Sequence, residues 1–325
     1  MKKILKLLSV VSISLIMACL VFFPDKYIPI AADGIKLWAI NVLPSLFPFF
    51  FFSLLLTKIG SPHKISSFFN PLTQRLFRCN GTIAYIFFMS VLSGYPVGAK
   101  LISELSKQGV ISKNEATRAA TLCSTSGPLF VIGTVGTVMF SSKFCGIVLF
   151  ISHILSAVIC GIIFGRIGNF KKSVLQPHSQ NKSENILYEC IYSSVISILC
   201  VGGFVCVFYI ISQIASSLNL MKIFEVMLSF LLKKNPHAKD IANGFIYGLI
   251  ECTAGCKSLS SHPCPISASL AGGLISFGGI SIIFQSVIYL SEAKVNLKIF
   301  FLSKVIQTLI TFSITLALLL VLKIF

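Results

Sequence analysis

Two lysines in apolar surroundings are the residues of this sequence best placed to do chemistry. Lys100 and Lys257 each stand two positions after a glycine, Gly98 and Gly255, where an apolar run is interrupted. A charge at membrane depth costs about 2.5–3.5 kcal/mol on insertion scales, so residues of this kind usually serve a function. We expect both lysines to bind a small anionic substrate, each facing one carboxylate of a dicarboxylate. The alternative is that they reach the lipid headgroups or form ion pairs.

Two acids stand close to these lysines along the chain. Glu104 follows Lys100 by four residues, a spacing that allows an ion pair on one helix face. Glu251 precedes Lys257 and is the acid of that segment. Three roles for Glu251 stay open: taking up a coupling proton, holding Lys257 until substrate arrives, or forming a structural ion pair.

A group of hydroxyl side chains is the third feature that is suited to binding a substrate or an ion. Ser124, Thr125 and Ser126 come directly before Gly127-Pro128, which interrupts an apolar helix. Their oxygens are suited to a substrate or a Na⁺ ion, or they satisfy backbone groups that the proline frees. Further candidates for substrate contact are Tyr95, Thr253, Ser276 and Gln285. Tyr95 and the run 49–52 of phenylalanines have rings that could stack on an aromatic cargo, with lipid contact or packing as the alternative.

Catalysis and metal binding have little support in the sequence. The 5 histidines and 11 cysteines are scattered, and no nucleophile motif, zinc motif or P-loop joins them. We therefore expect no enzyme activity, no catalytic residue, no cofactor and no metal. Signatures of nucleic-acid binding are also missing from the sequence.

The composition indicates an all-α polytopic membrane protein. The 325 residues are 55% hydrophobic and 11% charged, whereas a soluble domain carries about 25% charged residues. Apolar runs near the length of a membrane-spanning helix recur along the chain. The net charge of +17 is carried by basic residues between these runs, where they set topology and contact anionic lipid.

The first half of the chain can be divided into elements by its charges, glycines and prolines. An extra N-terminal span, with a cytoplasmic N-terminus, precedes a neutral outer loop over 24–36. We then expect a span over 37–57, an interfacial helix, a re-entrant hairpin over 82–107, a broken span over 116–140 and a plain span over 145–164. The residues expected to interrupt helices in the whole chain are Pro44, Pro48, Gly94, Pro96, Gly98, Gly127, Pro128, Gly255, Gly278 and Gly279.

The second half repeats this order. It has a span over 191–214, an amphipathic segment over 220–234, a hairpin over 241–257, a broken span over 268–290 and a last span over 299–322. Each half would cross the membrane three times, and an odd number inverts the second half relative to the first. We therefore predict an N-terminal helix and loop (1–36), two inverted repeats (37–165 and 186–325) and a polar cytoplasmic linker (166–185).

Three stretches of the first half resemble a known family. Leu43–Phe50, Ser93–Lys100 and Ser124–Phe130 are similar to the YlbJ-type sporulation integral membrane proteins. That family belongs to the nucleoside-recognition ("Gate") domain group, which is distantly similar to concentrative nucleoside transporters. The resemblance implies a transporter in the cell membrane or the mother-cell-derived outer forespore membrane. The implied cargo is dipicolinate, moved from the mother cell toward the forespore.

The leading hypothesis is thus a secondary transporter or facilitator of a small organic anion, with H⁺ or Na⁺ as the coupling ion. A structural or assembly protein of the sporulation membranes that moves no cargo is the alternative from another class. A nucleoside transporter is a further alternative, and a homo-oligomer stays open. An intramembrane enzyme ranks last.

Overall fold

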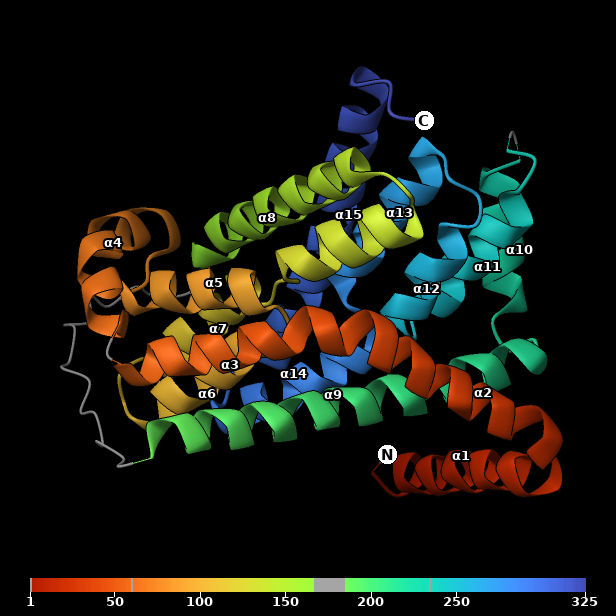
Figure 1. The fold of residues 1–325 in the computed structure, drawn as a ribbon, viewed down its shortest axis with the longest axis horizontal. Coiled ribbons are helices and arrows are strands. Elements are labelled where there is room, and N and C mark those ends of the chain that lie inside the picture. The colour runs from red at the N-terminus through yellow and green to blue at the C-terminus, as the bar shows by residue number, and fades with distance from the viewer. Residues whose placement is uncertain (1, 60, 167–184, 234) are drawn as a thin grey trace.

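The computed structural model describes residues 2–59, 61–166, 185–233 and 235–325, and within these ranges all regular elements are helices (Figure 1). The first part contains α1 (Lys2–Phe22), α2 (Pro24–Leu37), the π-helical η1 (Trp38–Val42), α3 (Leu43–Ile59), α4 (Ser61–Phe77), α5 (Thr82–Ser93), α6 (Val97–Lys107), α7 (Lys113–Leu122), the π-helical η2 (Leu129–Met139) and α8 (Lys143–Gly165). The second part contains α9 (Ile186–Ser217), α10 (Lys222–Leu231), α11 (Ala238–Gly248), α12 (Cys252–Leu259), α13 (Pro265–Phe277), α14 (Gly279–Glu292) and α15 (Leu297–Val321).

Several of these helices are suited to crossing a membrane. Five segments of the described chain are long and apolar enough: Pro24–Ile59, Lys143–Gly165, Ile186–Ser217, Pro265–Glu292 and Leu297–Val321. A sixth would be the pair Ile65–Phe77 and Thr82–Ser93, which is bent by 93°. Many large apolar side chains of these helices are exposed, as a lipid-facing surface requires. The protein is a polytopic α-helical membrane protein, as the composition predicts.

The same order of elements occurs in both parts. A long span is followed by an amphipathic helix (α4 or α10), a hairpin (α5–α6 or α11–α12), an interrupted span (α7–η2 or α13–α14) and a last span (α8 or α15). The two parts also exchange contacts, because α6 packs against α14 while α12 packs against η2. Such reciprocal contacts fit two repeats related by a two-fold axis. Most of the predicted linker 166–185 lies outside the described residues.

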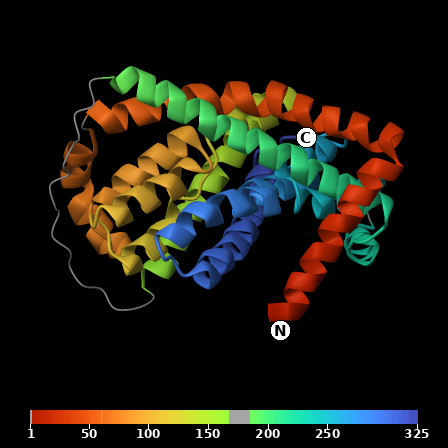
Figure 2. The same cartoon turned by 90° about the horizontal axis from the view of Figure 1, so that it is seen from below.

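The predicted outer loop 24–36 is helical instead, which corrects the sequence-based boundary. Pro24 occupies the first turn, where its missing N–H has no helical acceptor, and Asp25 lies at the favourable N-terminal end. The Tyr27 hydroxyl lies 3.0 Å from the Ser217 hydroxyl of α9. Figure 2 shows α9 running alongside the α2–α3 span, while α1 turns back and leaves the body of the protein.

The prolines of this span do not interrupt it, contrary to the expectation for Pro44 and Pro48. The backbone stays helical through both, and the π-helical η1 lies directly before Pro44. A widened turn of this kind relieves the clash that a proline causes with the preceding turn. The Ser45 hydroxyl lies within hydrogen-bond distance of the carbonyls of Asn41 and Val42, at 3.0 and 2.9 Å, and so supplies a donor there.

Gly98 and Gly255 also lie inside helices, α6 and α12, rather than at the predicted interruptions. A Cβ at Gly98 would lie 1.8 Å from the carbonyl oxygen of Cys123, and one at Gly255 would lie 2.4 Å from Cα of Gly248. These glycines therefore permit close backbone packing. The hairpin turns are formed by residues 94–96 and 249–251.

We predict that Gly98→Ala destabilises the protein, since the new methyl group overlaps the Cys123 carbonyl. Overpacking of this kind costs about 1–3 kcal/mol, to be measured as a lower thermal midpoint in detergent. Gly203→Ala on α9 is the matched control, because a Cβ there has no neighbour within 4 Å. We expect that control to be neutral or slightly stabilising. Equal midpoints for the two variants would contradict the packing argument.

Candidate functional site

The interruptions of both parts meet in the centre of the protein. In the first part, Gly94 of the hairpin turn packs so closely on Gly127 that a Cβ would lie 2.8 Å from the Gly127 nitrogen. In the second part, the N–H of Ile280 donates to the Leu249 carbonyl at 2.8 Å, which joins α14 to the other hairpin turn. The Tyr95 hydroxyl reaches across to the carbonyl of Ser276 at 3.3 Å. The two hairpin turns and the two interrupted spans thus form one central site.

A lysine from the last span lies in this site. Lys304 of α15 is only 2% exposed. Its ammonium group donates to the carbonyls of Ser124 (2.6 Å) and Ser276 (3.0 Å), the hydroxyl of Tyr95 (2.9 Å) and the amide oxygen of Gln307 (3.1 Å). Lys304 was not among the predicted site residues, although a lysine inside the predicted span 299–322 is itself a signal of function.

A histidine links the same two interrupted spans. His153 of α8 is fully buried, and its Nε2 accepts a 2.9 Å hydrogen bond from the N–H of Ser126. Its Nδ1 lies 2.7 Å from the Ser276 hydroxyl, so the neutral ring carries its proton on Nδ1 and donates there. The Ser276 hydroxyl also contacts that of Thr311 at 2.6 Å. In the sequence His153 is one of several scattered histidines, and its partners in this network are remote in the chain.

Glu251 caps a short helix beside this network. Its carboxylate is 1% exposed and accepts hydrogen bonds from the N–H groups of Thr253 (3.1 Å) and Ala254 (2.6 Å) at the start of α12. A helix N-terminus carries a partial positive charge, which suits a carboxylate. Lys257, one turn further along α12, is exposed. The structure therefore pairs Glu251 with the backbone, where the sequence suggested Lys257 as one partner.

A small cavity lies between these groups. Its polar lining comes from Tyr95, Ser126, Glu251, Thr253 and Gln285, and its apolar wall from Val42, Leu46, Phe130, Val201, Val205 and Ile282. Its volume is about 30 Å³, which holds about two water molecules. The site is therefore closed around its own polar groups in this conformation.

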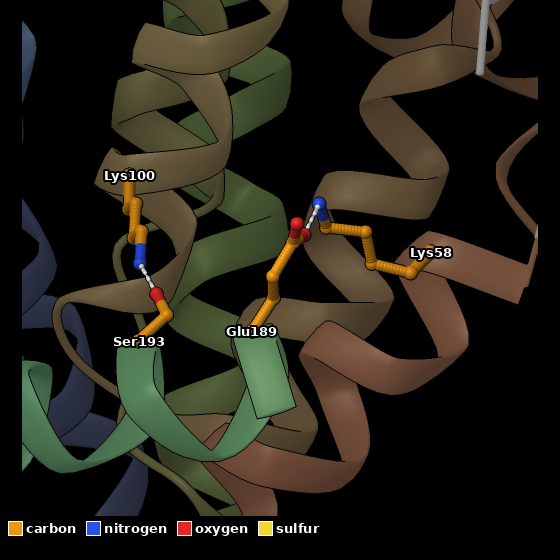
Figure 3. Close-up of polar contacts among 4 residues, drawn as sticks. All are labelled: Lys58, Lys100, Glu189 and Ser193. Carbon is orange, nitrogen blue, oxygen red and sulfur yellow. Dashed lines mark hydrogen bonds and ion pairs between the residues drawn. The ribbon is translucent and has the colours of Figure 1, made fainter. Parts of the chain in front are cut away.

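The two predicted substrate lysines lie at different places. Lys100 is half-buried, and its ammonium group donates to the hydroxyl of Ser193 on α9 at 2.8 Å (Figure 3). The neighbouring ion pair of Lys58 with Glu189, at 2.7 Å, holds the start of α9 to the end of α3 (Figure 3). Lys100 thus faces α9, although Glu104 stands one turn away on its own helix.

Lys257 lines a larger cavity of about 480 Å³ between α2, η1, α9 and α12. Asp33, Lys36, Asn41, Tyr209 and Gln213 line it as well. Along α9, Ser193 and Tyr209 are separated by about 24 Å at the usual helical rise. The structure therefore does not bring Lys100 and Lys257 to one substrate. It places them beside opposite ends of α9.

A series of separate cavities lies along α12 between this larger cavity and the centre. A second cavity of about 100 Å³ shares Gln213, Ala254 and Ser258 with the first. The central cavity begins at Thr253, the neighbour of Ala254. We call this series the α12 vestibule.

The other residues predicted for the site or for the helix interruptions lie at the breaks of the two interrupted spans. Thr125 is buried, and its hydroxyl contacts the Ser90 hydroxyl at 2.9 Å, which in turn accepts a 3.3 Å hydrogen bond from the Thr125 N–H of the interrupted backbone. The Ser124 side chain is buried with no hydrogen-bond partner among the described residues. Gly278 and Gly279 have positive φ angles of 88° and 66°, which glycine adopts readily and which form the break between α13 and α14.

Two further histidines come together at the far end of the second hairpin. The rings of His237 and His262 stack at 3.9 Å, and His262 Nε2 lies 3.4 Å from the Asp240 carboxylate. Their ligand atoms all lie within 4.8 Å of one another, a donor set of the kind that binds transition metals. No local pattern predicts this cluster, because its members are brought together by the hairpin.

Broken spans, paired hairpins and buried charges at their junction define the class: a polytopic membrane protein with an internally repeated helical architecture. The chain is similar to "Sporulation integral membrane protein YlbJ" of Bacillus subtilis (strain 168), with 28% identity over 315 residues that cover 89% of this chain and 77% of that protein. This similarity supports the resemblance to the YlbJ-type sporulation integral membrane proteins. No family model and no solved structure matches the chain.

Proposed function

We propose that this protein is a secondary transporter or facilitator that moves a small organic anion across a sporulation membrane. The observation that carries the proposal is the convergence of both hairpin turns and both broken spans on one buried polar site. A structural scaffold has no need for unwound backbone or for internal charges such as Glu251 and Lys304 at membrane depth. In transporters built from inverted repeats, substrates bind where broken helices meet.

The start of α12 is the proposed anion site. Two N–H groups there already hold a carboxylate, that of Glu251, at 3.1 and 2.6 Å. A substrate carboxylate makes the same hydrogen bonds once Glu251 turns away or takes up a proton. Two carboxylates cannot share these donors while both are charged. Proton uptake by Glu251 therefore couples to anion binding.

The family resemblance implies that the cargo is dipicolinate, an aromatic dicarboxylate. The Tyr95 ring beside the cavity offers an aromatic surface for it. Transport runs toward the forespore across the outer forespore membrane, with the N-terminus in the cytoplasm. Both assignments rest on the resemblance and on the distribution of basic residues.

The α12 vestibule supplies one path to the site, and Lys257 attracts the anion at its mouth. Lys100, at the other end of α9, has the corresponding role on the opposite side of the membrane. The central cavity of about 30 Å³ is too small for an organic anion, so the hairpins must move apart to admit one. The conformation described here is thus the closed one in the proposed cycle.

The test is uptake of labelled dipicolinate into vesicles that contain the purified protein, with uridine as a second cargo. Dipicolinate uptake that exceeds that of empty vesicles supports the proposal. Uptake of uridine alone would favour a nucleoside transporter. Uptake of neither, from protein shown to be folded and inserted, would favour a structural role in the sporulation membranes.

Lys257→Gln gives a prediction for the vestibule. Because Lys257 is exposed at the mouth, we expect a KM for dipicolinate several-fold higher with a thermal midpoint like that of the native protein. The rise should shrink at high salt, since screening removes the attraction. Lys239→Gln, an exposed lysine on α11, is the matched control. The same KM in both variants would rule out the attracting role.

A further inference from the structure

The four atoms around the Lys304 ammonium group have the chemistry of a cation site. Each is a neutral oxygen, and their distances from Nζ run from 2.6 to 3.1 Å. Two of them are backbone carbonyls at the ends of interrupted helices, Ser124 just beyond α7 and Ser276 in the last turn of α13. Helix C-termini carry partial negative charge, and carbonyls of this kind coordinate Na⁺ or protons in transporters with broken helices.

The ammonium group of Lys304, a residue of the protein itself, donates hydrogen bonds to all four oxygens. It reaches the site from α15, and its oxygen partners come from the hairpin turn of the first part, the break after α7, the break after α13 and α15 itself. Buried charges require compensation, and here the compensation consists of dipoles. The other buried charge of the central site, Glu251, is held by backbone N–H groups at the start of α12.

We propose that the Lys304 ammonium group is a tethered cation that occupies the cation site between the two interrupted spans. A dissociable Na⁺ therefore has no place there, and the protein holds both parts together without one. For transport the consequence, which rests on the proposed function, is that uptake does not require Na⁺. The coupling ion is then H⁺, with Glu251 as its carrier.

Two substitutions at position 304 separate this proposal from a general packing role. Lys304→Ala removes the amine and leaves space beside the four oxygens. Lys304→Met removes the charge but fills the same space with a neutral chain of similar length. The thermal midpoint of each purified protein is measured in NaCl, KCl, LiCl, NH4Cl and choline chloride at equal ionic strength. Lys298→Ala, an exposed lysine of the same helix, is the matched control.

We expect the native protein and Lys298→Ala to have the same midpoint in every salt. Lys304→Ala should melt at a lower temperature in choline chloride and recover in a saturable manner as Na⁺ or NH4⁺ is added, because these ions fit the vacated site. Lys304→Met should melt at a lower temperature and recover in no salt. Choline is too large to enter, so recovery specific to small cations reports occupation of the site.

Three results would overturn the proposal. One is a saturable rise of the native midpoint with Na⁺ over choline, which would reveal a free ion. Another is an equal response of Lys304→Ala and Lys304→Met to all salts, and the third is failure of Lys304→Ala to fold in every salt, NH4⁺ included. Because the midpoint does not depend on transport, recovery by small cations without any uptake of dipicolinate would refute the proposed function and leave the tethered cation standing.

Discussion

Glu251→Gln should abolish the coupling of anion uptake to protons. In vesicles with a gradient of one pH unit, one coupled proton supplies about 1.4 kcal/mol, enough for roughly tenfold accumulation of the anion. The native protein should approach that ratio, and its uptake should rise as the pH on the substrate side falls, because protonated Glu251 frees the α12 donors. The glutamine mimics the protonated acid, so the variant should equilibrate the anion without accumulating it.

The pH range and the control make this result specific. Between pH 6 and 8 the free carboxylates of the cargo stay ionised, because the ordinary pKa of a carboxyl group is about 4. Asp25→Asn, which neutralises an exposed acid, should accumulate the anion like the native protein. Accumulation that persists in Glu251→Gln would exclude Glu251 as the proton carrier.

His153→Ala should be the most destabilising single change to the network between the interrupted spans. It leaves the Ser126 N–H and the Ser276 hydroxyl without their shared partner in a fully buried place. The unsatisfied Ser126 N–H costs about 1–3 kcal/mol, and the cavity left by the ring adds to the loss, while the Ser276 hydroxyl keeps its contact with Thr311. We expect a clearly lower thermal midpoint and loss of dipicolinate uptake.

Two other histidine variants calibrate that result. His237→Ala removes an exposed ring and should change stability by no more than about 0.5 kcal/mol. His153→Gln keeps an acceptor and a donor and should recover part of the loss. If His153→Ala melted like His237→Ala, the bridge between the spans would contribute nothing to stability.

The order of elements could be predicted because glycine, proline and charge act locally. The hairpin around Gly94 and Pro96 and the break at Gly127-Pro128 follow from backbone conformations that these residues favour or forbid. Pro44 and Pro48 were wrongly predicted as interruptions on the same local grounds, since their span stays helical, with a π-helical segment directly before Pro44. The local argument was also wrong for Gly98 and Gly255, where the need for glycine comes from a neighbouring chain segment.

The central site could be predicted only in part, because its contacts join remote residues. Lys304 and Ser124 are 180 positions apart, and no local pattern pairs them. The matched positions of Lys100 and Lys257 suggested a shared substrate. However, positions related by a two-fold axis are close together only near that axis, and these lysines lie several residues beyond their hairpin turns.

The contacts between the first and second parts of the chain affect the order in which the protein can fold during synthesis. The carbonyl of Ser124 and the hydroxyl of Tyr95 are synthesised long before α15, which brings the ammonium group that satisfies them. Until that helix inserts, the first part holds unsatisfied polar groups in the membrane. We therefore expect chains that stall before α15 inserts to keep these polar groups unsatisfied within the membrane, and insertion of α15 to complete the central site.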